Sequence, residues 1–494
     1  MTGSKIKKFY FGLPLVWAAL CVTAALGGYP FLYIVSFVLF CYLILFLGTK
    51  YAVWLLLPKG VKNTLKNHKI AFNITVLAGL ILLFLGHQAL KFFSGNFSAK
   101  GSSSSPSASL DNLRTLPYLD WVPAQDNIDK SGVTKYETDL AGKGVNLYAA
   151  CTIPQAHLID MSGKILNTWK LKSYTRRHQK LALWPLAELL ANGDLLALSS
   201  ETMLARLDWQ SKVKWQIPMR AHHDFCVDEK GLLYALERQD EIIFWKGLPV
   251  PMLNDYITVL APEGEIIKRI SIANIMKNNV PARDIWYIYR WLINPRHFCE
   301  IIQWKLQRHY IFANHSIFDI FHTNSVKLMN NDIENVCKKG DLLILVRNQN
   351  WIGILDQQKE KVIWSWGPGI IDRPHHPTNL DNGNILIFDN GYYRGYSRII
   401  EVDPLDKKIV WEYLADPKKQ FYCPIRGSCQ RLPNGNTLIT DSEQGKVFEV
   451  TADGRIVWEF YNFYVRQNTK QRVPIYRMTR IVDLENYPSL RRFR

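Results

Sequence analysis

Three histidines, an asparagine and an arginine occupy related positions in successive segments of the sequence. His375 and His223 each stand seven residues before the first residue of a tight turn. The segment between them carries His322 and Asn324, and Arg347 ends the apolar strand that follows. An arginine at the end of a buried strand is costly unless it meets an anion or a carboxylate. The set therefore predicts a site that binds an anionic group and supplies a histidine as nucleophile or proton shuttle.

Two of these positions are histidine doublets, because His222 precedes His223 and His376 follows His375. Doublets of this kind also occur in metal sites, but the sequence has no Cys-x-x-Cys pair and no His/Cys spacing typical of a metal centre. We therefore predict no metal and no other cofactor.

A repeat with a period of 46 or 47 residues must position these side chains. One half of the unit is a tight turn followed by an apolar strand, and Asn-Gly pairs in it favour type I′ hairpin turns. The other half ends in a tryptophan, and the matching residues are Trp169, Trp215, Trp364, Trp411 and Trp458. The long gap after Trp215 spans three units, one of which keeps the pattern without its tryptophan. Six hairpin-built repeats of this length predict an all-β six-bladed propeller.

Two parts of the chain depart from the repeat. The first unit, near residues 144–171, lacks a turn-and-strand half, and we expect a strand from residues 461–494 to complete it. An insertion near residues 271–320 is rich in aromatic and basic residues. It is interpreted either as a packed helical elaboration or as a surface that caps the funnel, lies on lipid headgroups or docks a partner.

The N-terminal part is apolar and lysine-rich. Residues 9–48 carry no charge and are interrupted by a Gly-Gly-Tyr-Pro turn, and residues 70–90 form a third uncharged run. These lengths predict three transmembrane α-helices in a membrane anchor over residues 1–93. Lysines before the first run and between the second and third place the N-terminus in the cytoplasm. The expected location is the inner (plasma) membrane, multi-pass, with residues 116–494 on the periplasmic or extracytoplasmic side beyond a Ser-rich linker at residues 94–115.

The net charge of +17 does not require nucleic-acid binding. Residues 1–100 contain ten lysines and no arginine, aspartate or glutamate, so most of the basicity belongs to the predicted anchor. No nucleic-acid partner is expected. Cys423 and Cys429, with five residues between them, are interpreted either as a disulfide in an oxidising compartment or as two buried thiols.

At residues 144–480 the sequence resembles the bacterial arylsulfate sulfotransferases that do not use an adenylyl-sulfate donor. The matching pieces are His223-Asp224, His322 to Ser325, Arg347, the run from His375 to Gly391, and the run from Arg426 to Leu438.

The resemblance implies a ping-pong transfer of a sulfuryl group from a phenolic sulfate to a phenol. It makes His375 the nucleophile, which forms a sulfo-histidine, and it makes His223, His322 and Arg347 the other catalytic residues. The substrate-binding residues that it implies are Asn324, His376, His222 and Arg426.

Three features depart from that family. His376 stands where an acidic residue is expected, so the group that orients His375 is left open. Residues 330–340 look inserted, and three membrane helices are not typical of these enzymes. Membrane lipid and a membrane protein complex are therefore additional expected partners. The alternative function is a catalytically inactive propeller that serves as a binding or scaffold subunit of such a complex.

Overall fold

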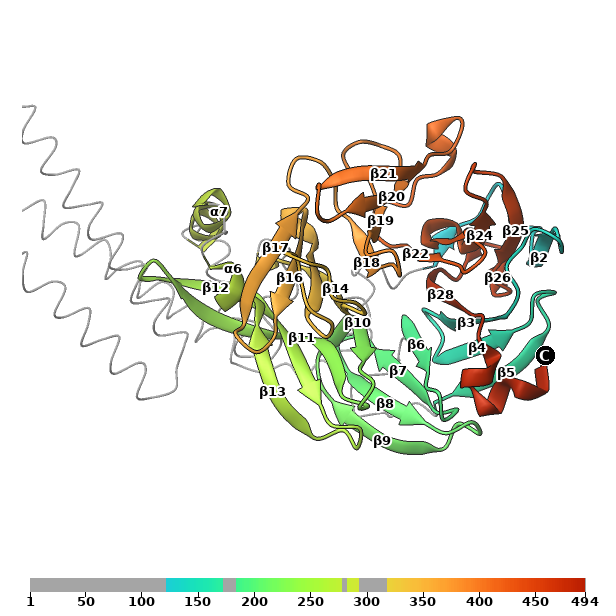
Figure 1. Cartoon of the computed structure of the whole chain (residues 1–494), viewed down its shortest axis with the longest axis horizontal. Helices are drawn as coiled ribbons and strands as arrows, with labels where there is room; N and C mark the ends of the chain where they lie inside the picture. Colours follow the sequence, from blue (N-terminus) through green and yellow to red (C-terminus); the bar gives the residue numbers. More distant parts are fainter. Residues whose placement is uncertain (1–120, 172–183, 278–281, 293–317, 494) are drawn as a thin grey trace, which may run out of the picture. The chain divides into compact units, whose positions relative to one another are not determined.

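The computed structural model describes residues 121–171, 184–277, 282–292 and 318–493. The described residues from Trp121 to Arg290 and from Phe318 onward belong to one compact unit. This unit is built mainly from short antiparallel strands, which Figure 1 shows as sheets around a common centre. Six sheets have four or five strands and a seventh has three.

The six larger sheets follow one another along the chain. The first contains β3 (Val145–Ala150), β4 (Gln155–Ile159) and β5 (Ile165–Lys170); the second contains β6 (Leu186–Leu189), β7 (Leu195–Ser199), β8 (Met203–Leu207) and β9 (Val213–Pro218). The third contains β10 (Ala221–Val227), β11 (Leu233–Trp245), β12 (Leu248–Leu260) and β13 (Ile266–Ser271); the fourth contains β14 (Thr323–Leu328), β15 (Leu342–Val346), β16 (Trp351–Asp356) and β17 (Lys361–Trp366). The fifth contains β18 (His375–Asn379), β19 (Ile385–Asp389), β20 (Arg398–Asp403) and β21 (Lys408–Tyr413); the sixth contains β22 (Ser428–Arg431), β23 (Thr437–Asp441), β24 (Lys446–Val450) and β25 (Ile456–Tyr461).

Strands from the two ends of this unit complete two of the sheets. β28 (Ile475–Ile481) pairs with β3 as the innermost strand of the first sheet, which confirms the closing strand expected from residues 461–494. β2 (Gly132–Tyr136) pairs with β25 at the outer edge of the sixth sheet. Contacts β3–β6, β7–β10, β10–β14, β14–β18, β18–β22 and β22–β28 then join all six sheets into a closed ring.

The tryptophans of the repeat connect neighbouring sheets. Each indole N–H donates a hydrogen bond of 2.8–3.1 Å to a backbone carbonyl in the outer turn of the next sheet. The bond from Trp458 to the carbonyl of Met161 joins the sixth sheet to the first. The third sheet lacks the tryptophan, and there Lys268 Nζ donates to the carbonyl of Gln357 at 3.2 Å. The period of the tryptophans is therefore the period of the inter-sheet hydrogen bonds.

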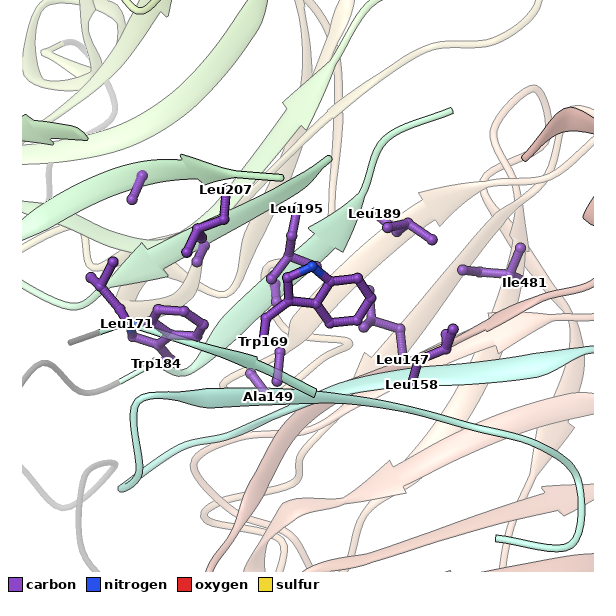
Figure 2. Close-up of a cluster of buried hydrophobic side chains, with 14 of the residues drawn as sticks. Leu147, Ala149, Leu158, Trp169, Leu171, Trp184, Leu189, Leu195, Leu207 and Ile481 are labelled. Atoms are coloured by element: carbon purple, nitrogen blue, oxygen red, sulfur yellow. The ribbon is translucent and has the colours of Figure 1, made fainter. Parts of the chain in front are cut away.

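Apolar residues fill the space between sheets. Figure 2 shows the cluster between the first and second sheets, where Trp169 packs among Leu147, Leu158, Leu195 and Leu207, all almost fully buried. Burying one such leucine stabilises the fold by roughly 1.5–3 kcal/mol. The strands of these sheets are apolar on both faces because each sheet is covered on both sides.

The fold class predicted from the sequence, an all-β six-bladed propeller preceded by three transmembrane helices, is wrong. There are seven sheets in the described residues, because β1 (Val122–Pro123), β26 (Val465–Arg466) and β27 (Gln471–Arg472) pair in a small sheet of their own. Among those residues, no helix is long and apolar enough to cross a membrane. That finding also overturns the predicted multi-pass location in the inner membrane. The three runs assigned to the anchor lie outside the described residues.

The predicted type I′ turns are also wrong. In the Asn-Gly turns the glycines Gly193, Gly383 and Gly435 have φ near +88°, whereas the preceding asparagines do not have positive φ. Each asparagine instead accepts a hydrogen bond on Oδ1 from the backbone N–H two residues later. This asparagine geometry with a left-handed glycine is that of a type I turn followed by a one-residue bulge.

The insertion is described in part. α6 (Ile272–Met276) and α7 (Ala282–Leu292) follow β13, and residues 278–281 and 293–317 lie outside the described residues. Ile285 and Ile288 of α7 are buried, and Tyr289 donates to the carbonyl of Pro249 at 2.6 Å. The described helix therefore packs on the long β11–β12 hairpin.

Candidate active site

The three sheets that carry the predicted site place its residues at one level of the ring. On each inner strand, the last residue that pairs with the second strand lies opposite the first residue of that second strand. His223, Asn324 and His375 each stand four residues before this last paired residue of their own inner strand. Asn324 is therefore the positional equivalent of the two histidines, and His322 lies two residues before it.

The inner strands are irregular at this level. The pairing register shifts in β10, β14, β18 and β28, whereas β6 and β22 pair without a shift. His223, His322 and His376 have φ of +58°, +49° and +47°, the left-handed region that few residues other than glycine adopt. Bulges and strained backbone of this kind re-aim side chains and gather at functional sites. The four bulged strands supply His223, Asn324, His375 and Tyr476.

Asn390 orients His375. The Asn390 side-chain nitrogen donates to the carbonyls of Cys423 and Arg426, both at 2.5 Å, so its Oδ1 must face the ring of His375 as an acceptor. His375 Nδ1 donates to that oxygen at 2.8 Å. The imidazole therefore carries its proton on Nδ1 and has its lone pair on Nε2. That Nε2 is buried and makes no hydrogen bond among the described residues.

Asn324 and Arg347 lie near His375, and each has one buried polar atom without a partner among the described residues. Asn324 donates from Nδ2 to the carbonyl of Pro374 at 3.0 Å, while its buried Oδ1 has no partner in the described part of the chain. Arg347 makes no ion pair with a described carboxylate, and its buried Nε is unpartnered. Its Nη1 and the guanidinium of Arg373 both donate to Asn348 Oδ1. Two cations held on one amide oxygen make this region suited to an anion.

His223 and His322 form a pair of histidines beside His375 and the polar residues around it. His223 Nε2 and His322 Nε2 are 3.0 Å apart. His322 Nδ1 bonds to Asp319 Oδ2, and the hydroxyl of Tyr476 lies 3.3 Å from His223 Nδ1. Tyr476 also stacks on His223, with ring centroids 6.1 Å apart.

Burial holds these imidazoles in their neutral form. It lowers the pKa of His375 well below its ordinary value, and the charge of Arg347 lowers it further. Burial and the neighbouring His322 likewise lower the pKa of His223. Burial also lowers the pKa of His322, although Asp319 acts in the opposite direction. A neutral imidazole is the nucleophilic form of histidine.

Three predicted substrate-binding residues make polar contacts with residues outside this group, although the ring of His222 also packs edge-on against His223, with ring centroids 5.1 Å apart. His222 Nε2 lies 3.2 Å from Asp255 Oδ1, and its Nδ1 lies 3.4 Å from Arg238 Nη2. His376 Nδ1 bonds to the carbonyl of Cys429 at 3.0 Å. The third, Arg426, is fully buried, and its Nη1 donates to Glu443 at 3.1 Å.

The two cysteines of the possible disulfide are free, buried thiols. The structure therefore favours the second of the two interpretations, two separate thiols in the core around β22. Burial raises the pKa of both thiols, which makes them unreactive.

A small group of ion-paired and hydrogen-bonded side chains around Asp224 lies next to His223. Asp224, the residue after His223, bonds to Arg477 Nη1 at 2.8 Å, Lys327 Nζ at 3.0 Å and Ser325 Oγ at 2.7 Å. The bond between Asp224 and Arg477 connects the third sheet to the first, which are not neighbours in the ring. We call these four residues the Asp224 brace.

A cavity of about 790 Å³ is lined by the later parts of the inner strands. Its lining includes Glu188, Cys226, Lys327 and Thr378. None of the predicted site residues lines it. This cavity is therefore not the predicted site.

Four residues that the sequence did not single out belong to the site: Asn390, Arg373, Asp319 and Tyr476. Asn390 and Arg373 lie in or beside runs already marked by the resemblance, so their proximity to His375 in sequence was a usable signal. Asp319 and Tyr476 lie in segments with no repeat signature. No sequence pattern identified them.

The comparisons with known proteins agree with the resemblance. A family model described as arylsulfotransferase (ASST) matches residues 187–463, more than half of the chain. No curated protein matches the chain.

Several solved structures have a similar chain trace. One is a protein of unknown function from Bacteroides caccae, with a TM-score of 0.40 and 12% identity over 68% of this chain and 98% of that one. A streptogramin B lyase has a TM-score of 0.40 and 12% identity, over 74% and 98% of the two chains. The Dos1 propeller has a TM-score of 0.36 and 9% identity, over 69% and 78%.

The family model covers the inner strands β10, β14, β18 and β22 with the residues around His223, His322 and His375. The chain belongs to the arylsulfotransferase (ASST) family.

Proposed function

We propose that the protein transfers a sulfuryl group from a phenolic sulfate ester to a phenol through a sulfo-histidine at His375. The observation that carries the proposal is the state of the His375 ring, whose Nδ1–H is fixed by Asn390 and whose Nε2 is buried, neutral and unpartnered among the described residues. A lone pair held in one direction in a buried site is a prepared nucleophile.

In the first half-reaction, Nε2 forms a bond to sulfur while the sulfur–oxygen bond of the ester breaks. The electron pair of that bond leaves with the phenolic oxygen. The sulfo-imidazole keeps its Nδ1–H, so it is an imidazolium and a good leaving group. In the second half-reaction an acceptor phenol loses its proton, its oxygen bonds to sulfur, and Nε2 recovers its lone pair.

The polar groups around Nε2 match the charge of the transferring group. In this proposal Arg347 Nε, the guanidinium of Arg373 and the second N–H of the Asn324 amide donate hydrogen bonds to the sulfuryl oxygens. Donors fixed before the reaction stabilise charge on such oxygens more effectively than water does. His223 and His322 are the side chains that bind the phenolic oxygen of the donor and of the acceptor. The described residues do not support contact with membrane lipid or a membrane complex.

The test is the intact mass of the full chain after exposure to an aryl sulfate alone, with His375→Ala beside it. We expect wild type to gain one SO3 unit, to lose it on addition of a phenol, and His375→Ala to gain none while its thermal unfolding is unchanged. A folded wild type that gains no adduct and releases no phenol from several donors would overturn the proposal and favour the alternative, a binding or scaffold subunit.

A further inference from the structure

Four side chains beside the nucleophile form one hydrogen-bonded chain: Asp319, His322, His223 and Tyr476. Asp319 and His322 come from the segment that leads into β14, His223 from β10 and Tyr476 from β28. The chain therefore joins three different sheets. It is separate from the hydrogen bond that orients His375.

The carboxylate of Asp319, at one end of this hydrogen-bonded chain, determines where one proton of His322 lies. Burial alone would raise the pKa of the Asp319 carboxyl, but His322 and Arg238 outweigh that effect and hold the pKa well below its usual range. An ionised carboxylate only accepts hydrogen bonds, so His322 Nδ1 carries a proton. The close contact of Asp319 with His322 thus leaves the opposite nitrogen, Nε2, as the atom whose protonation can change.

Two arrangements of protons satisfy the remaining contacts. When His322 is neutral, its Nε2 accepts from His223 Nε2–H, and Tyr476 donates to His223 Nδ1. When His322 is an imidazolium, its Nε2–H donates to His223 Nε2, and His223 Nδ1–H donates to the Tyr476 oxygen. The two arrangements differ by one proton, and every side chain keeps a partner in both.

Building on the proposed function, we infer that Asp319 makes His322 the proton store for the phenolic oxygen, which enters between the two Nε2 atoms and replaces the hydrogen bond between His322 and His223. Asp319 and Tyr476 are positioning residues. His322 gives its Nε2 proton to the oxygen that leaves sulfur, and it takes the proton of the acceptor phenol when that oxygen attacks sulfur. The first turnover draws the proton from solvent as the anionic ester binds, and each later one reuses the proton of the previous acceptor.

The inference defines the class of substrate. A phenol of ordinary acidity, with a pKa of about 10, is a poor leaving group unless it is protonated as it departs. A nitrophenol is acidic enough to leave as its anion. A site that holds a buried carboxylate behind its acid–base histidine is therefore suited to unactivated phenols as both donor and acceptor.

The groups around His322 determine its titration. They are Asp319, which favours the imidazolium, and Arg347, Arg238, His223 and His375, which with burial oppose it. Asp319 is the carboxylate in direct contact with the ring. Removing the charge of Asp319 should therefore lower the pKa of His322 more than that of any other described histidine.

The experiment compares wild type, Asp319→Asn and the control Asp240→Asn on two donors, phenyl sulfate and 4-nitrophenyl sulfate. Asp240 is a part-buried carboxylate that pairs with Arg220 outside the site. We expect Asp319→Asn to lose on the order of 100-fold in kcat with phenyl sulfate and only a few-fold with 4-nitrophenyl sulfate, as removal of acid–base assistance predicts. Equal losses with both donors would mean that Asp319 is merely structural and would overturn the inference.

A second measurement does not depend on turnover. The ring nitrogens of His322 are titrated by NMR in histidine-labelled full chain, with His322→Gln used for assignment. We expect Asp319→Asn to lower the pKa of His322 by at least about one unit, and an unchanged titration would overturn the inference. If wild type showed the titration but no sulfuryl transfer, the proposed function would fail while the pairing of Asp319 with His322 stood.

Discussion

Asn390 faces His375 with its side-chain oxygen and two backbone carbonyls with its side-chain nitrogen. The amide therefore has a single orientation, and it determines which nitrogen of His375 carries the proton. The sequence left the group that orients His375 open, and in the structure a neutral amide holds this position. A neutral partner leaves the imidazole less basic than a carboxylate would.

Asn390→Ala should slow formation of the sulfo-enzyme by roughly tenfold to a hundredfold, the loss typical when the hydrogen-bond partner that orients a metal-ligating histidine is removed. The ring would lose the acceptor that keeps Nδ1 protonated. The measurement is the rate of mass increase in a rapid-quench experiment with an aryl sulfate. Asn384→Ala, a change in a hairpin turn far from the site, should react at the wild-type rate. Adduct formation at the wild-type rate in Asn390→Ala would show that the amide is not the orienting group.

Arg347→Gln should reduce activity without reducing stability. The side chain is half-buried with its Nε enclosed, and burial followed by the charge of Arg373 lowers its pKa to about 10, so few nearby negative charges compensate the cation in the folded protein. We expect a higher KM for the sulfate donor and a slower adduct, with an unfolding temperature equal to or above that of wild type. Arg455→Gln, at an exposed ion pair with Glu137, serves as the control for loss of a positive charge. A lower unfolding temperature in Arg347→Gln would instead assign Arg347 a structural role.

Glu449→Ala should strongly destabilise the ring. Glu449 of β24 pairs with Arg480 of β28, both fully buried, and it also accepts hydrogen bonds from Asn436 and the backbone of Gly142. Removing one partner leaves an uncompensated buried charge, which costs about 3–5 kcal/mol. Chemical denaturation measures this loss. Glu229→Ala, at an exposed ion pair, should leave the midpoint unchanged, and equal midpoints for the two variants would contradict the prediction.

Asp441 should make stability fall as the pH rises from about 4 to 7. Burial raises the pKa of its carboxyl from the ordinary value of 3.8 to about 7. In this window the folded protein holds a proton that the unfolded chain releases, so a higher pH favours unfolding, by about 4 kcal/mol across the window. Asp441→Asn should flatten the unfolding free energy between these pH values. Asp453→Asn, at an exposed turn, should keep the wild-type slope, and the same slope in Asp441→Asn would refute the assignment.

The repeat was readable from the sequence because each of its signals has a local cause. Trp458 and its equivalents recur because each donates to the next sheet, and the glycines of the Asn-Gly turns recur because the turn needs one residue with positive φ. The type I′ prediction failed at this point because the asparagine side chain stabilises a turn in which only the glycine is left-handed. The positions of His223 and His375 followed from the same repeat.

The rest of the site depends on contacts across the ring. Tyr476 meets His223 over a separation of 253 residues, and only the closure of the ring by β28 brings them together. Asp319 precedes a bulged strand, where a one-residue shift in register changes which side chains face the centre. Composition did not distinguish Asp319 from the other acidic residues.

The Asp224 brace also fixes the distance between two strands of the site. Asp224 and Arg477 meet across the ring, and both side chains are nearly inaccessible to solvent. Each stands next to a member of the hydrogen-bonded chain, because His223 precedes Asp224 on β10 and Tyr476 precedes Arg477 on β28. Separating the two strands would leave two buried charges uncompensated. The ion pair therefore holds His223 and Tyr476 at hydrogen-bonding distance.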